Sequence, residues 1–207
     1  MTTKLRNGDQ GFESTLTAFE DSRKRLGLDV IDLYLIHWPV PSQDTYLETW
    51  RAFEKLLADG AVRSIGVSNF LPEHLDRLIA ESAVVPAVNQ FEVHPTFQQR
   101  DLSLATTKAG IAVEAYSPLG RGADLEAASV VAIAERLGVS TGQVVLRWHL
   151  QQGRIVIPKS ANPERIRANL DVTSFDLTEA DLAAIDALEA GNRQASDPAT
   201  ADFSQYR

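Results

Sequence analysis

Short apolar runs alternate with longer amphipathic segments along the whole chain. The runs are four to seven residues long, rich in β-branched side chains and bounded by polar or turn-forming residues. Near-continuous apolar runs of this kind are typical of strands buried on both faces of a parallel sheet. The pattern predicts six strands, over residues 2–5, 30–36, 62–67, 88–93, 111–116 and 154–157.

The longer segments repeat apolar residues at helical spacing, and several carry signals of helix ends. Gly27, Gly60, Gly110 and Gly138 each follow a helical pattern, in the position where a left-handed residue commonly ends a helix. Residues 140–143 have the spacing of a capping box. The predicted helices cover residues 14–26, 45–59, 72–80, 100–109, 127–137, 144–152, 163–169 and 178–189, and the polar tail from residue 191 is expected to be irregular.

Alternation of strands and helices over the whole length predicts an α/β fold with a parallel sheet and right-handed crossovers. Two architectures fit the pattern, an open doubly wound sheet and a (β/α)8 barrel. The open sheet usually carries a G-x-G-x-x-G turn after its first strand, and this sequence has none. A barrel needs eight strands and typically about 250 residues. No linker interrupts the pattern, so residues 1–207 are expected to form a single domain.

Composition narrows the classes of partner. The chain carries 20 Lys and Arg against 28 Asp and Glu, a net charge of −8, which argues against nucleic acid and anionic membranes as partners. A phosphorylated cofactor needs only a local cluster of cations. The sequence has no cysteine, which excludes disulfides and thiolate metal sites and suits the cytosol. No run approaches 18 apolar residues, so no transmembrane helix is expected.

Polar or aromatic side chains follow nearly every predicted strand. The carboxyl ends of parallel strands meet at one edge of a sheet or one face of a barrel, so these residues are expected to converge on a site. They are Lys4, His37 with Trp38, Ser68 with Asn69, Gln90 with His94, Tyr116 with Ser117, and Lys159 with Ser160.

Two of these groups allow more than one interpretation. Lys159 and Arg165 flank a predicted helix start, which indicates either a phosphate site or a capped helix with solvated charges. His37 could donate a hydrogen bond to a substrate carbonyl or pack at a strand end, and Trp38 could line a pocket or fill the core. His74, expected on a surface helix, and His149 are interpreted as structural, His94 stays ambiguous, and the histidines and acids show no metal-ligand spacing.

Taken together, the motifs resemble the aldo-keto reductase family, in particular its bacterial 2,5-diketo-gluconate-reductase-like branch. Six blocks follow the family order over nearly the whole chain. They are TKL at 3–5, LYLIHWP at 33–39, IGVSNF at 65–70, VNQ at 88–90 with HP at 94–95, AYSPL at 115–119, and IPKS at 157–160 with PERI at 163–166 and Asn169.

The resemblance implies NADPH-dependent reduction of a small aldehyde or ketone by a cytoplasmic protein that is a monomer when complete. It implies that Lys4 lowers the pKa of a catalytic tyrosine and that His37 polarises the substrate carbonyl. Trp38 matches a wall of the substrate pocket. The cofactor contacts that it implies are Ser68, Asn69 and Gln90 for the nicotinamide carboxamide, Tyr116 for ring stacking, Ser117 and Leu119 for the pyrophosphate, Lys159, Ser160 and Arg165 for the 2′-phosphate, and Asn169 for adenine.

The family's catalytic tyrosine and its supporting aspartate belong to a segment that would precede Met1. Tyr34, Tyr46 and Tyr206 do not match the motif of that tyrosine. The resemblance therefore predicts a (β/α)8 TIM barrel that is incomplete at the N-terminus, with about six of eight strands. Three interpretations follow: a truncated or misassigned start of an ordinary reductase, a short form that binds NADPH without reducing carbonyls, and a non-enzymatic fragment.

Overall fold

The computed structural model describes residues 1–203, which leaves Tyr206 outside the described part. The chain divides into two compact units. Within the described part, the first unit holds residues 1–90, 102–112 and 196–203, and the second holds residues 91–101 and 113–195. The six predicted strands are confirmed, and they form one sheet in chain order. They are β1 (Thr2–Leu5), β2 (Ile31–Ile36), β3 (Val62–Ser68), β4 (Val88–Glu92), β5 (Ala112–Tyr116) and β6 (Ile155–Val156).

The register of the parallel strands in the first unit fixes which side chains share a face. Lys4 pairs with Leu35, and Leu35 pairs with Gly66, so these three positions form one row across β1, β2 and β3. A Cβ atom at residue 66 would lie 2.7 Å from both the Val88 carbonyl oxygen and a Leu35 methyl carbon. The absence of a side chain at Gly66 therefore lets β3 and β4 approach each other at this row.

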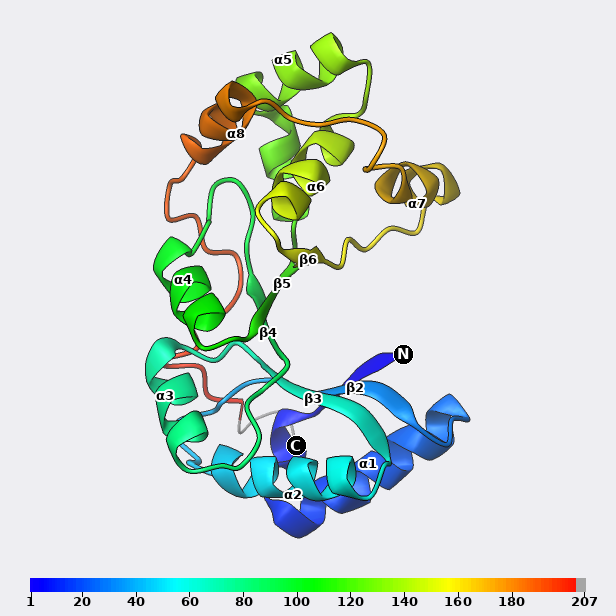
Figure 1. The fold of residues 1–207 in the computed structure, drawn as a ribbon, viewed down its shortest axis with the longest axis vertical. Helices are drawn as coiled ribbons and strands as arrows, with labels where there is room; N and C mark the ends of the chain where they lie inside the picture. Colours follow the sequence, from blue (N-terminus) through cyan, green and yellow to red (C-terminus); the bar gives the residue numbers. More distant parts are fainter. Residues whose placement is uncertain (204–207) are drawn as a thin grey trace. The chain divides into compact units, whose positions relative to one another are not determined.

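Helices of the first unit cover the sheet with aromatic side chains. Helices α1 (Phe12–Leu26) and α2 (Tyr46–Ala58) run side by side against β1, β2 and β3, as Figure 1 shows, and α3 (Pro72–Ala80) and α4 (Arg100–Lys108) complete the unit. The Tyr34 ring stacks on Phe53 at a centroid distance of 4.5 Å and meets Phe19 edge-on at 5.4 Å. All three side chains are fully buried, so burial of apolar area holds this unit together.

The second unit packs its helices around Trp148. Its elements are the 3-10 segment η2 (Gly120–Glu126) and the helices α5 (Ala128–Leu137), α6 (Thr141–Gln151), α7 (Pro163–Leu170) and α8 (Glu179–Asp186). The Trp148 indole donates to Asp186 Oδ1 at 2.8 Å, and the Arg154 guanidinium covers the indole ring at 4.5 Å. The predicted capping box is confirmed, because Ser140 Oγ accepts from the Gln143 N–H at 3.2 Å while Gln143 Oε1 accepts from the Ser140 N–H at 3.0 Å.

The structure corrects the expected placement of His74. Its side chain is buried, and its Nδ1 accepts a hydrogen bond from the Leu71 N–H at 3.1 Å, which caps the start of α3. The residue is structural, as expected, but it lies against the core.

No single helix within residues 1–203 is long and apolar enough to cross a bilayer. Only α5 and α6 taken together reach the required length and composition, and these two helices meet at 96°.

The close approach at Gly66 predicts a loss of stability on adding one methyl group. We expect Gly66→Ala to lower the free energy of unfolding by about 1–3 kcal/mol, because the strand backbone must shift to admit the new Cβ atom. Gly142→Ala is the matched control, since its Cβ would meet no heavy atom closer than 3.9 Å. It should raise the free energy of unfolding by up to about 1 kcal/mol. Urea unfolding followed by tryptophan fluorescence measures both, and equal values for the two variants would contradict the account.

Candidate active site

Four strand-exit residues of the first unit are joined by hydrogen bonds. Ser68 Oγ donates to the Gln90 carbonyl oxygen at 2.8 Å, and the Asn69 side-chain amide donates to the His37 carbonyl oxygen at 3.0 Å and to Ser68 Oγ at 3.1 Å. Ser68, Asn69 and Gln90 are all buried. Asn69 has φ 62°, a left-handed conformation that aims its amide back across the strand exits. The parallel sheet therefore brings these sequence-predicted residues together.

The surroundings of His37 favour the neutral form of its imidazole. The residue is exposed and directly follows β2 (Ile31–Ile36). Desolvation, reinforced by the Lys4 ammonium, lowers the pKa of His37 to about 4. The ring can consequently donate a neutral N–H hydrogen bond without carrying charge.

Lys4 and Trp38 lie in the same unit as His37. Lys4 is half-buried on β1, and its positive charge contributes to the lowered pKa of His37. Trp38 is buried, and its ring lies 5.0 Å from the ring of Phe203. Gln10 Nε2 donates to the Trp38 carbonyl oxygen at 2.8 Å, which fixes the backbone after β2. An ammonium group, a neutral imidazole and an aromatic wall thus stand at neighbouring strand positions.

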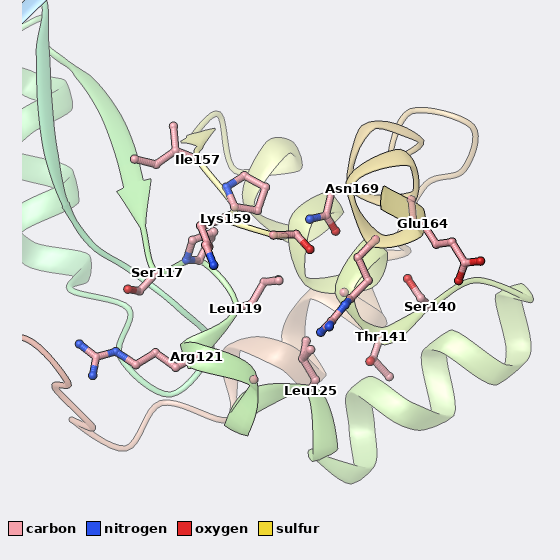
Figure 2. Close-up of a pocket in the computed structure, with 17 residues that line it drawn as sticks. Ser117, Leu119, Arg121, Leu125, Ser140, Thr141, Ile157, Lys159, Glu164 and Asn169 are labelled. Carbon is pink, nitrogen blue, oxygen red and sulfur yellow. The ribbon is translucent and has the colours of Figure 1, made fainter. Parts of the chain in front are cut away.

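The second unit contains a cavity of about 610 Å³ between the exits of β5 and β6 and the starts of α6 and α7. Figure 2 shows Leu119, Lys159 and Asn169 at this cavity, from the segment after β5, the segment after β6 and helix α7 respectively. Six residues predicted to contact the cofactor line this cavity, namely Ser117, Leu119, Lys159, Ser160, Arg165 and Asn169. The pairing of Ala115 with Val156 explains the proximity, because it aligns the two strand exits.

The cationic side chains of the cavity have no anionic partner in the described part of the chain. Neither Lys159 nor Arg165 forms an ion pair within residues 1–203, although both line the cavity. The start of α7 is already capped, because Asn162 Oδ1 accepts from the N–H groups of Glu164 and Arg165 at 2.8 and 3.1 Å. An anion here would be held by the two cationic side chains, and not by the backbone N–H groups that the sequence suggested.

Tyr116 ends β5 in the second unit and is half-buried. Burial raises the pKa of its phenol above the ordinary value, and the nearby charge of Glu92 acts in the same direction. The hydroxyl is therefore a poor acid, which is compatible with the ring-stacking role that the resemblance implies for it.

Part of the cavity wall was not predicted from the sequence. Arg121, Gly122 and Leu125 of η2 line it, as do Ser140, Thr141 and Gly142 at the start of α6. The capping box at 140–143 located the start of α6 but not the space beside it. The η2 segment has no apolar periodicity, so only its glycine-rich sequence hinted at a special loop.

Metal ligation has no candidate among the described residues. No group of three His, Asp or Glu side chains in residues 1–203 is arranged to hold a metal ion. The cluster of Glu92, His94 and Asp124 was also not foreseen, apart from the ambiguity over His94.

This chain is similar in sequence and in structure to known aldo-keto reductases. A sequence model described as "Aldo/keto reductase family" matches residues 2–190. An aldo-keto reductase of Mycobacterium sp. (strain KMS) is 52% identical over 204 residues, which cover 99% of this chain and 74% of that protein. Morphine 6-dehydrogenase of Pseudomonas putida is 47% identical over 219 residues, covering 100% and 74%. A variant of Gox0644 solved in complex with NADPH superposes with a TM-score of 0.95 at 50% identity, covering 98% of this chain and 75% of that one.

The environment of His37 predicts a titration that NMR can follow. We expect the His37 imidazole to titrate well below pH 6.5, and Lys4→Met to raise its pKa because the variant removes a nearby positive charge. Lys108→Met, which removes a lysine from the last turn of α4, is the matched control and should leave the titration unchanged. A His37 pKa near 6.5 in all three proteins would show that the ring is neither desolvated nor coupled to Lys4.

Proposed function

Because the chain belongs to the aldo/keto reductase family, we propose that it binds NADPH and reduces a small aldehyde or ketone to an alcohol by hydride transfer. The cavity of the second unit carries this proposal, because its Lys159 and Arg165 form no ion pair within residues 1–203 and line a space of about 610 Å³. The NADPH complex of Gox0644, with its TM-score of 0.95, supports the choice of cofactor.

The residues around the cavity suit a 2′-phosphorylated nucleotide. Lys159 and Arg165 would hold the 2′-phosphate by charge, and Ser160 would add a hydroxyl beside them. Asn169 would contact adenine from α7, and Ser117 and Leu119 would contact the pyrophosphate from the exit of β5. The assignment is supported because all six residues line one cavity. Together they offer cations, hydroxyl groups and a side-chain amide, which suit a phosphorylated nucleotide.

The polar cluster of the first unit suits the nicotinamide end. Ser68, Asn69 and Gln90 would bind the carboxamide group, which offers both a donor and an acceptor. The bond from Ser68 Oγ to the Gln90 carbonyl oxygen and the bond from the Asn69 amide to Ser68 Oγ hold the Ser68 and Asn69 side chains in position before any ligand arrives. Tyr116 would stack on the nicotinamide ring and define which of its faces meets the substrate.

When bound, NADPH would supply a hydride to the carbonyl carbon of the substrate. The alkoxide oxygen would then take its proton from solvent water, because none of the described tyrosines matches the family's proton donor. His37 orients the substrate by donating a neutral N–H hydrogen bond to the carbonyl oxygen, since its lowered pKa keeps the ring uncharged. The Lys4 ammonium favours the negative charge that develops on that oxygen during hydride transfer. Trp38 supplies an aromatic wall that excludes water on one side.

A second candidate function is NADPH binding without carbonyl reduction. The developing alkoxide must receive a proton, and the tyrosine that the family resemblance assigns to this task matches none of the described tyrosines. Burial raises the pKa of Tyr34, and burial also raises that of Tyr116, so neither phenol is activated as an acid. Turnover by this chain therefore separates the two candidates.

A cytoplasmic, monomeric protein completes the proposal. The cysteine-free sequence suits a reducing compartment. Cell fractionation and size-exclusion chromatography test the two points separately.

Cofactor selectivity tests the phosphate site directly. We expect Arg165→Ala to weaken NADPH binding by roughly tenfold or more while changing NADH binding little, because only NADPH carries the 2′-phosphate. Arg167→Ala is the matched control, since this exposed arginine lies on the same helix but does not line the cavity. Fluorescence titration measures both cofactors. An equal loss for NADPH and NADH would remove Arg165 from the phosphate site.

Turnover tests the proposed reaction. We expect the chain to bind NADPH and to oxidise it in the presence of 4-nitrobenzaldehyde, with the loss of absorbance at the nicotinamide band as the readout. His37→Ala should keep cofactor binding and lower kcat/KM on the order of 100-fold, because it removes the group that polarises the carbonyl. Binding without turnover would favour the second candidate, and absence of NADPH binding would contradict both.

A further inference from the structure

Three ionisable side chains form a buried cluster at the exit of β4, in the second unit. His94 Nδ1 lies 2.7 Å from Asp124 Oδ2, and His94 Nε2 lies 3.4 Å from Glu92 Oε1. All three side chains are at most 2% exposed. Burying such a group of charges costs free energy unless each member is paired. The cluster is therefore a candidate for a specific structural or functional role.

Asp124 connects the cluster to the loop that lines the nucleotide cavity. Its carboxylate accepts from the Thr96 hydroxyl at 2.9 Å and from the Thr96 N–H at 3.2 Å, in addition to His94. The same carboxylate packs against Gly120, where a Cβ atom would come within 2.5 Å of it. Asp124 is part of η2, whose Arg121, Gly122 and Leu125 line the cavity.

Glu92 connects the cluster to the chain after α8. Its two carboxylate oxygens accept the N–H groups of Gln194 and Ala195, each at 3.0 Å. The Gln194 side chain in turn donates to the Gly120 carbonyl oxygen at 3.0 Å. Two routes from His94, one through Asp124 and one through Glu92 and Gln194, therefore converge on Gly120.

The loop on which they converge has a strained backbone. Ser117 has φ 48°, Gly120 has φ 54°, Arg121 has φ 52° and Gly122 has φ 98°. Left-handed conformations at non-glycine residues cost energy and persist only where the surroundings fix them. Here the fixing contacts come from Asp124, from Gln194, and from His149, whose Nε2 donates to the Pro118 carbonyl oxygen at 3.0 Å.

We infer that the buried His94 imidazolium, paired with Asp124 and Glu92, is a positioning device that holds residues 117–125 in the conformation that binds the cofactor. The inference rests on the proposed NADPH function of the cavity. His94 does not line the cavity and acts through the two carboxylates. Loss of its charge leaves two buried carboxylates facing one neutral ring, which favours opening of the loop and of residues 190–195.

The charge state of His94 makes this device sensitive to pH. Its two carboxylate partners outweigh desolvation and raise the pKa of His94 to about 9. The stabilisation is fully present below the ordinary pKa of about 6.5 and is lost as the pH rises through about 9. The charged or titratable side chains that face the cluster from neighbouring elements are Glu92 and Asp124 themselves, His149 and Arg154, Tyr116, Arg121 and Arg193.

The test compares the unmodified chain with His94→Gln, using His74→Gln as a matched control that removes a buried histidine from the first unit. Amide hydrogen exchange reports the loop without any ligand. We expect exchange in residues 117–125 and 190–195 to be on the order of tenfold faster in His94→Gln only. NADPH affinity, measured by fluorescence titration, should fall in the same variant by a similar factor.

The pH profile separates positioning from a merely structural effect. In the unmodified chain, exchange in these segments, corrected for its intrinsic pH dependence, should accelerate in a step near pH 9 that His94→Gln lacks. If His94→Gln does not fold, the presence or absence of the step near pH 9 in the unmodified chain tests the inference on its own. Unchanged exchange and NADPH affinity in His94→Gln, or no step in the unmodified chain, would overturn the inference. If the unmodified chain shows the step near pH 9 but does not bind NADPH, the proposed function is contradicted. The role of His94 in holding residues 117–125 would still stand.

Discussion

Parallel strand pairing is the constraint on which both candidate sites depend. Parallel strands all leave the sheet at the same end, so residues far apart in the chain become neighbours there. In the first unit this brings the exits of β2, β3 and β4 together, and the Asn69 amide already bonds the His37 carbonyl oxygen. In the second unit the Ile157 N–H donates to the Ala115 carbonyl oxygen at 3.3 Å, which aligns the exits of β5 and β6 beside the cavity.

Three histidines show how burial and neighbours decide the role of one residue type. His37 loses its charge because desolvation and the Lys4 ammonium lower its pKa to about 4. His149 is fully buried, which lowers its pKa to about 3, and its neutral ring holds the Pro118 carbonyl. His94 is just as buried, yet two carboxylates raise its pKa to about 9. The same type of side chain is therefore neutral at a strand exit, neutral in a buried loop contact, or charged in a buried cluster, according to its partners.

Much of the fold followed from local patterns in the sequence. Apolar runs such as residues 30–36 predicted the strands, and the Ser140 capping box predicted the start of α6. The predicted fold class, a (β/α)8-type barrel with about six of its strands in this chain, is confirmed. Local patterns failed where long-range contacts decide the conformation. Helix α1 begins at Phe12 and not at Ser14, because the Gly11 N–H that precedes it bonds Thr49 Oγ1 in α2. The η2 segment depends on the ion pair of Asp124 with His94, 30 residues away in the chain, and no periodic pattern records such a pair.

The proposed cofactor binding depends on the cavity that Lys159 and Arg165 line, and the ionisation of a bound 2′-phosphate tests this dependence most directly. A phosphate monoester loses its second proton near pH 6, and two adjacent cations favour the dianion. A phosphorus NMR titration of NADPH in the presence of the protein follows that proton without requiring turnover. Binding should lower the pKa of the 2′-phosphate, and Lys159→Met should weaken this shift. A 2′-phosphate that titrates alike in free and protein-bound NADPH would show that the cofactor does not lie against these cations.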